Sequence, residues 1–197
     1  MLQTNYLREK FELIDQQGWA VLDLPYEFCL KLLAAAQNRF QNHEFTSAAI
    51  TQNSVESQKN LDIRSDWTRW LPESSTDVTE QTVLDFLKKI QLELSQFFRF
   101  GLTHFECHYA LYQTGQFYKR HSDQTKNNNH RFFSFVIYLN ENWLPEYGGQ
   151  LIGYNQQKRI FEIQPNMGKM ILFKSDLEHE VAAAFKPRWS LTGWFRK

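Results

Sequence analysis

The chain has 197 residues, of which 42% are hydrophobic and 16% aromatic, enough apolar material for one domain with a full-sized core. Its 22 Lys and Arg residues balance its 22 Asp and Glu residues, so the net charge of zero gives no general attraction to nucleic acid or to an anionic membrane. Two cysteines are too few for a disulfide framework, and the polar first ten residues contain neither a signal peptide nor a membrane span, so we expect a cytoplasmic protein.

The first hundred residues have mainly helical patterns. Residues 5–17 and 26–42 place apolar side chains among charged ones, and the segment between them, 19–24, is typical of a short strand. The clearest helix is expected at 77–97, where apolar residues follow a spacing of three and four, and where Asp77 and Glu80 can form a capping box. The polar residues 43–60 predict a loop.

After about residue 104 the pattern changes to short strands separated by turn residues. The predicted strands are 104–113, 117–121, 132–140, 150–154, 159–163, 170–173, 179–183 and 188–195. Eight short strands behind a helical portion predict an α+β fold, a double-stranded β-helix (jelly-roll) core with the N-terminal helices packed on one sheet. We expect a single domain over 1–197, in which 1–100 provide mainly helical support and a substrate loop and 101–197 form the catalytic core.

Three residues in the strand-rich half form a candidate metal site. His121 and Asp123 are two positions apart, so on a strand both side chains point to one face, and the chain can return with His179 much later. Two histidines and one carboxylate form the facial triad of non-haem iron(II) oxygenases. A zinc hydrolase could use the same three ligands. The spacing alone therefore leaves the type of site open.

Arg188 opens the last predicted strand. Alternation places it on one face with Ser190, Thr192 and Trp194, and a charged group on an inward face needs an anionic partner. That partner could be the carboxylate of a co-substrate or a structural Asp or Glu. Tyr138 lies opposite the apolar face of its strand, so its hydroxyl either reaches the same carboxylate or belongs to an ordinary core tyrosine.

His104 and His108 alternate with apolar residues along the predicted strand 104–113. They could suggest a second metal site. We interpret them instead as polar residues of a half-buried strand.

Six segments in chain order resemble the prolyl 4-hydroxylases. The run YQTGQFYKRHSD at 112–123 resembles their metal-binding segment, and it is most similar to the prolyl-hydroxylase-domain type, which includes the hypoxia-inducible-factor hydroxylases and their bacterial relatives. The other matching segments are DIRSDWTRWL at 62–71, YLNENW at 138–143, GGQL at 148–151, FKSDLEHEV at 173–181 and RWSLTGWF at 188–195. One departure is Ser65, which stands where the family often has glycine.

The resemblance implies a role for each matched residue. The iron(II) ligands would be His121, Asp123 and His179. The pocket for 2-oxoglutarate would be formed by Arg188 and Tyr138 at the distal carboxylate, Thr192 beside them, Tyr112 near the chelating end, and Leu151 and Trp194 in the wall. Substrate contacts would come from Arg131 at the mouth, Tyr118, Arg64 and Asp66, the last two within a mobile loop at 61–71.

The implied reaction is hydroxylation of a prolyl residue of a protein, with O2 and 2-oxoglutarate consumed, succinate and CO2 released, and ascorbate as a candidate reductant. A translation-related protein is a candidate substrate. Two alternatives stay open: an oxygenase acting on another peptidyl residue or a small molecule, and a catalytically inert metal-binding interaction module. A nucleic-acid substrate is disfavoured, because the related dealkylases typically carry a second Arg where this chain has Trp194.

Overall fold

The computed structural model describes residues 2–48, 63–124 and 130–197. The first half contains α1 (Thr4–Gln17), β1 (Trp19–Asp23), α2 (Tyr26–Gln41), β2 (Thr46–Ser47), β3 (Trp67–Trp70) and α4 (Val78–Phe98). The second half contains β4 (His104–Tyr112), β5 (Tyr118–His121), β6 (Arg131–Tyr138), η1 (Pro145–Tyr147), β7 (Leu151–Asn155), β8 (Lys158–Ile163), β9 (Lys169–Lys174), β10 (Glu178–Val181) and β11 (Arg188–Arg196). All eight strands predicted beyond residue 104 are present, with small shifts at their ends.

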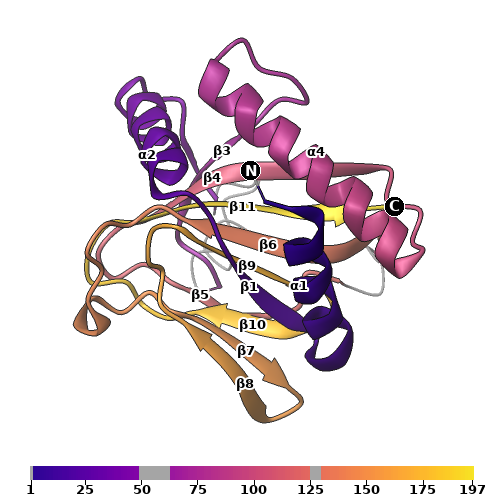
Figure 1. Cartoon of the computed structure of the whole chain (residues 1–197). Coiled ribbons are helices and arrows are strands. Elements are labelled where there is room, and N and C mark those ends of the chain that lie inside the picture. The colour runs from indigo at the N-terminus through magenta and orange to yellow at the C-terminus, as the bar shows by residue number, and fades with distance from the viewer. Residues whose placement is uncertain (1, 49–62, 125–129) are drawn as a thin grey trace.

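The strands form two antiparallel sheets, and the helices cover the outer face of the larger one (Figure 1). The larger sheet has seven strands in the order β1-β9-β6-β11-β4-β3-β2, and the smaller has four in the order β5-β10-β7-β8. This is the predicted jelly-roll with N-terminal helices packed on one sheet.

Alternation along the central strands divides their side chains between two cores. On β4, Cys107, Tyr109 and Leu111 join the core beneath the helices, whereas Ala110 and Tyr112 join the core between the sheets. The same division holds on β6, because successive side chains of a strand point to opposite faces. Residues on the second face can therefore form a site between the sheets.

Helix α4 begins at a capped end, but the predicted capping box is wrong in one half. Asp77 Oδ1 accepts hydrogen bonds from the backbone N–H groups of Thr79 and Glu80, at 2.9 and 3.1 Å. The carboxylate of Glu80 does not return to Asp77. It is fully buried and accepts instead from Arg39 Nε at 3.1 Å and Arg69 Nη1 at 2.9 Å, because those guanidinium groups offset its burial.

The segment expected to be a mobile loop at 61–71 is partly a strand. Trp67–Trp70 form β3, which pairs antiparallel with β4 and, through Thr46–Ser47, with β2. The prediction of a loop over these residues is wrong, since they pair with β2 and β4 as a strand of the larger sheet. Residues 61 and 62 and most of the expected loop at 43–60 lie outside the described residues.

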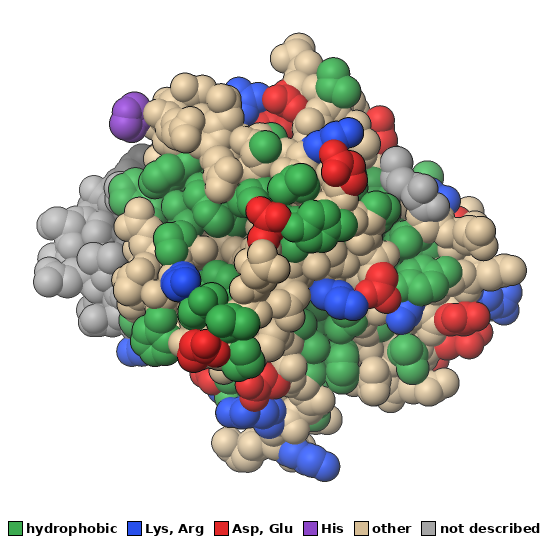
Figure 2. Space-filling model, turned by 60° about the vertical axis from the view of Figure 1, so that its left-hand side comes forward, with side chains coloured by type: hydrophobic (Ala, Val, Ile, Leu, Met, Phe, Trp, Pro, Cys, Tyr) green, Lys and Arg blue, Asp and Glu red, His purple; other side chains and the backbone are tan. Residues whose placement is uncertain are grey.

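On the face drawn in Figure 2, positive and negative side chains are interspersed with apolar ones, in agreement with the zero net charge. Within the described ranges, no helix is both long enough and apolar enough to cross a membrane.

Candidate metal and co-substrate site

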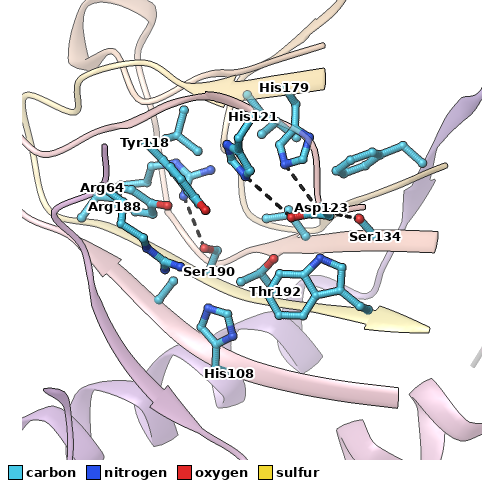
Figure 3. A pocket seen from close by; sticks show the side chains of 17 residues that line it. Arg64, His108, Tyr118, His121, Asp123, Ser134, His179, Arg188, Ser190 and Thr192 are labelled. Atoms are coloured by element: carbon cyan, nitrogen blue, oxygen red, sulfur yellow. Dashed lines mark hydrogen bonds and ion pairs between the residues drawn. The ribbon is translucent and has the colours of Figure 1, made fainter. Parts of the chain in front are cut away.

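A pocket between the two sheets collects side chains from both of them and from Arg64 (Figure 3). The larger sheet contributes through β4, β6, β9 and β11, and the smaller through β5, β7 and β10. Most of the residues proposed for metal and co-substrate binding line it, namely His121, Asp123, His179, Arg188, Tyr112, Thr192, Leu151, Trp194 and Tyr118.

The three metal-ligand candidates come together at one end of this pocket. His179 on β10 is the register partner of His121 on β5, and Asp123 follows directly after β5. The Nε2 atoms of His121 and His179 lie 3.6 and 3.5 Å from the two carboxylate oxygens of Asp123. Ligand atoms of all three residues lie within 4.8 Å of one another, which is close enough for one ion to contact each.

Hydrogen bonds orient both histidines for metal binding. His121 Nδ1 lies 2.7 Å from the carbonyl oxygen of Lys119, and His179 Nδ1 lies 3.0 Å from that of Leu177. A carbonyl can only accept, so in each neutral ring Nδ1 carries the proton and Nε2 keeps its lone pair. Both lone pairs are then directed toward the side of Asp123, the arrangement in which histidines ligate a metal through Nε2.

The electrostatics of the site suit a cation. Burial lowers the pKa of His179, so its ring stays neutral and able to ligate. Burial alone would raise the pKa of Asp123, but that pKa lies below its usual range, and the hydroxyl of Ser134, which donates to the carboxylate at 2.6 Å, contributes to lowering it. The carboxylate is therefore ionised.

Arg188 lies at the other end of the pocket and is 1% exposed. Its Nε donates to the carbonyl of Gly149 at 2.7 Å and its Nη1 to Ser190 Oγ at 3.3 Å, but its Nη2 has no hydrogen-bond partner among the described residues. No carboxylate of those residues forms an ion pair with it, which removes the structural salt bridge that the sequence left open.

A second unpartnered group lies beside Arg188. The hydroxyl of Tyr138 is buried without a hydrogen bond, and the guanidinium carbon lies 5.4 Å from the Tyr138 ring centroid. Burial raises the pKa of Tyr138, so the hydroxyl keeps its proton and remains a donor. A buried cation with a free N–H beside a free O–H is suited to a ligand carboxylate.

Gly149 keeps this end of the pocket open. Its φ is +70°, in the left-handed region, and a Cβ atom there would lie 2.9 Å from Cδ of Arg188. Any side chain would therefore be strained and would press on the arginine.

Thr192 lines the pocket, but its hydroxyl donates to the carbonyl of Phe135 at 2.9 Å. The hydroxyl proton of Thr192 is therefore already used in a hydrogen bond to the backbone of β6. Tyr112 is buried in the pocket wall, with the Arg188 guanidinium 5.0 Å from its ring centroid.

The residues expected to contact substrate divide into two groups. Arg64 lines the pocket and lies 4.6 Å from the ring centroid of Tyr118, which lines it too. Asp66 does not line the pocket. It is fully buried and binds Arg64 in a bidentate pair at 2.8 and 2.7 Å, so it positions Arg64 and is withdrawn from any substrate. The expectation that Asp66 contacts substrate is therefore wrong.

Arg131 does not line the pocket itself but packs on Trp194, which does. Its guanidinium lies 3.6 Å from the ring centroid of Trp194 and is held by Glu106 at 2.7 Å. The cation–π contact and the ion pair fix both side chains at this side of the pocket.

The interpretation of His108 as a residue of a half-buried strand is wrong. It is 2% exposed, lines the pocket on the same face of β4 as Tyr112, and its Nδ1 has no hydrogen-bond partner. Its ring packs against those of Trp70 and Trp194, with centroids 4.6 and 5.5 Å away, and the two indoles also contact each other at 6.1 Å. Burial, with the nearby positive charge of Arg64, lowers its pKa to about 3, so the ring is neutral. The spacing of four residues from Tyr112 was the available signal, since positions i and i+4 of a strand share a face.

Comparisons with known proteins agree with this geometry. The family model described as the 2OG-Fe(II) oxygenase superfamily matches residues 107–196. A Pseudomonas putida prolyl-4-hydroxylase is 32% identical, with 97% of this chain and 99% of that one aligned at a TM-score of 0.88. No curated protein sequence matches at a significant level.

Two more distant structures share the fold. A prolyl hydroxylase from Trichoplax adhaerens, solved with a hypoxia-inducible-factor peptide, is 24% identical over 98% of this chain and 88% of that one, with a TM-score of 0.78. A viral collagen prolyl hydroxylase from Paramecium Bursaria Chlorella virus-1, solved with 2-oxoglutarate, is 17% identical over 93% and 98%, with a TM-score of 0.62.

The match with the P. putida enzyme extends over nearly the whole of both chains. Enzymes of the matched superfamily use iron(II), 2-oxoglutarate and O2, and a His-Asp-His group is present between the sheets. The chain is therefore a dioxygenase that belongs to the 2OG-Fe(II) oxygenase superfamily, within its prolyl 4-hydroxylase-like group.

Proposed function

We propose that this dioxygenase hydroxylates a prolyl residue of a protein, with iron(II) held by His121, Asp123 and His179 and with 2-oxoglutarate held by Arg188. The observation that carries the proposal is the pairing, in one pocket, of a metal-ready triad with a buried arginine whose Nη2 is unpartnered. The residues fit both groups, because Nδ1 of each histidine faces a backbone carbonyl and leaves Nε2 for a metal, the aspartate is ionised, and the arginine faces no carboxylate of the described chain.

When bound, iron(II) and 2-oxoglutarate would supply the electrons that activate O2, which is the oxidant: one of its oxygen atoms would enter succinate, formed with CO2 from 2-oxoglutarate, and the other would enter the substrate. The protein's own residues bind and orient. Arg188 and Tyr138 provide the donors for the distal carboxylate, and Thr192, Tyr112, Leu151 and Trp194 form the wall around the co-substrate. Apolar side chains of the wall, such as Val181 and Phe173, exclude water from the reacting centre.

The likeness to the P. putida prolyl-4-hydroxylase supports a prolyl substrate. The Trichoplax prolyl hydroxylase was solved with a peptide, which supports a protein rather than a small molecule. The rings of Trp70 and Trp194, which pack against each other and against His108, offer planar apolar surfaces suited to a proline ring. Polar contacts could come from Tyr118, Arg64 and Arg131. Within this class, we propose a cytoplasmic translation-related protein as the first candidate substrate, and ascorbate as the reductant that restores the iron.

The test uses a pair of host-cell extracts, one from cells with the enzyme and one from cells carrying the His179→Ala variant. Mass spectrometry of tryptic peptides should find a prolyl residue heavier by one oxygen atom in the first extract alone. The same purified enzyme should convert 2-oxoglutarate to succinate with that peptide. Modification of a residue other than proline would contradict the substrate class, and no succinate with any peptide fraction would contradict the enzymatic function.

A further inference from the structure

Two buried serines lie behind the triad and take part in none of the roles given above. Ser134 on β6 and Ser175, which follows β9, are 2% and 0% exposed. Ser134 Oγ donates to Asp123 Oδ2 at 2.6 Å, and the oxygens of the two serine hydroxyls lie 2.8 Å apart. Figure 3 shows Ser134 beside Asp123, on the side away from Arg188.

The direction of this chain of hydrogen bonds follows from proton counting. An ionised carboxylate only accepts, so the single proton of the Ser134 hydroxyl is used on Asp123. The bond between the two serines must then be donated by Ser175 to Ser134. The order is Ser175 to Ser134 to Asp123, and each bond polarises the next, which strengthens the contact with the charged oxygen.

Ser175 also anchors the backbone on both sides of Asp123. Its carbonyl oxygen accepts from Ser122 Oγ and from the backbone N–H of Gln124, both at 3.1 Å. Its own N–H donates to the carbonyl of Phe132 at the start of β6, at 3.0 Å. Asp123 lies outside any strand, so these contacts replace the pairing that positions His121 and His179.

We propose that Ser134 and Ser175 are positioning residues that fix the rotation of the Asp123 carboxylate, holding Oδ2 and leaving Oδ1 for the metal. The inference rests on the proposed metal site. A carboxylate without this restraint could turn or offer both oxygens, and either change would weaken the ion or occupy a position that the co-substrate or O2 needs. The relay would thus keep the carboxylate as a single-position ligand.

The experiment measures Co(II) binding to the metal-free protein by titration followed in the visible absorption spectrum, with thermal unfolding of the metal-free form measured alongside. Ser134→Ala should raise the Kd for Co(II) about 10- to 100-fold and alter the spectrum of the bound ion. Ser175→Ala should raise the Kd less, because Ser134 still donates. Ser134→Thr keeps the hydroxyl and should bind Co(II) nearly as the wild type does.

The double variant provides the sharpest outcome. If Ser175 acts through Ser134, Ser134→Ala with Ser175→Ala should have the same Kd as Ser134→Ala alone, whereas independent effects would multiply. The control is Ser95→Ala, which removes a hydrogen-bonded serine hydroxyl on α4 and should leave the Kd unchanged.

Three results would overturn the relay. They are wild-type Co(II) affinity in Ser134→Ala, multiplicative effects in the double variant, and a change in Kd for Ser134→Thr as large as for Ser134→Ala. If Ser134→Ala does not fold, Ser175→Ala and Ser134→Thr still test the relay. The relay requires a weaker Co(II) affinity in Ser175→Ala and a nearly unchanged Co(II) affinity in Ser134→Thr. Failure of the wild type to bind Co(II) would instead refute the metal site itself, and the relay with it.

Discussion

His121 and His179 are register partners across the antiparallel strands β5 and β10, with ring centroids 4.3 Å apart. Each ring directs Nδ1 to the backbone carbonyl two residues earlier, so the two rings are held in the same way. The pairing of two short strands therefore creates the histidine half of the candidate metal site. Only Asp123 comes from outside a strand, and it is held by side chains.

Arg188 should determine co-substrate affinity without affecting the metal. Removing charge-assisted hydrogen bonds to a carboxylate typically costs about 1.5–3 kcal/mol, so Arg188→Ala should raise the KM for 2-oxoglutarate at least about tenfold. Arg188→Lys should recover only part of this, because an ammonium cannot form the paired contacts of a guanidinium. Steady-state succinate formation measures both values. An unchanged KM in Arg188→Ala would remove Arg188 from the co-substrate site.

Gly193 should be intolerant of any side chain. A Cβ atom there would lie 2.2 Å from the carbonyl oxygen of Glu106 and 2.7 Å from the ring of Phe135. Gly193→Ala should lower the free energy of unfolding by about 1–3 kcal/mol, since overpacking forces the backbone to shift. Gly101→Ala is the matched control, because nothing lies within 4 Å of its Cβ position. Urea unfolding tests the pair, and equal stability of the two variants would contradict the close approach of β11 and β4.

Glu80 should be essential to the packing of α2 and β3 against α4. Its buried carboxylate binds Arg39 and Arg69, so Glu80→Ala leaves both guanidinium groups without their buried partner and should cost about 3 kcal/mol or more. The contrasting variant is Glu12→Ala, whose ion pair with Arg8 is largely exposed and should contribute less than about 0.5 kcal/mol. Chemical denaturation of both variants measures the difference. A small loss in Glu80→Ala would show that the network is dispensable.

His108 should make stability depend on pH. Its folded pKa is about 3, below the ordinary value of 6.5, so between these values the unfolded chain binds a proton that the folded protein does not. The contribution of His108 to the free energy of unfolding is therefore fully present above pH 6.5, and it is lost progressively as the pH decreases toward 3. Replacing it by methionine should reduce the loss of stability between pH 7 and pH 5 by about 2 kcal/mol.

The control for this pH dependence is His130→Asn, which changes an exposed histidine. It should show the same loss of stability as the wild type over that interval, measured by urea unfolding of the metal-free protein. An unaltered slope in His108→Met would mean that His108 is not buried as a neutral ring.

The local periodicity of apolar residues, two in strands and three to four in helices, was sufficient to predict most of the fold, because it depends only on neighbours in the chain. The last eight strands and helix α4 were predicted from it, and so was the shared face of Arg188, Ser190, Thr192 and Trp194. The sequence resemblance added the assignment to the prolyl 4-hydroxylase-like group, which spacing alone could not distinguish from a zinc site.

Features that depend on distant partners were not predicted. The carboxylate of Glu80 binds Arg39 and Arg69, which lie on other elements, and does not cap its own helix. Alternation places His108 on a face but does not say that Trp70 and Trp194 cover it. The contact of Ser134 with Ser175 joins β6 to the turn after β9, 41 residues later in the chain, so no local pattern could reveal it.

The most direct test of the account compares the wild type with His179→Ala in one assay, which measures succinate formed from 2-oxoglutarate at saturating iron(II) together with Co(II) binding. Removing one of three ligands should abolish succinate formation and raise the Kd for Co(II) by at least about tenfold, while His130→Ala should change neither. Retained succinate formation in His179→Ala would contradict the central claim that this triad holds the catalytic metal.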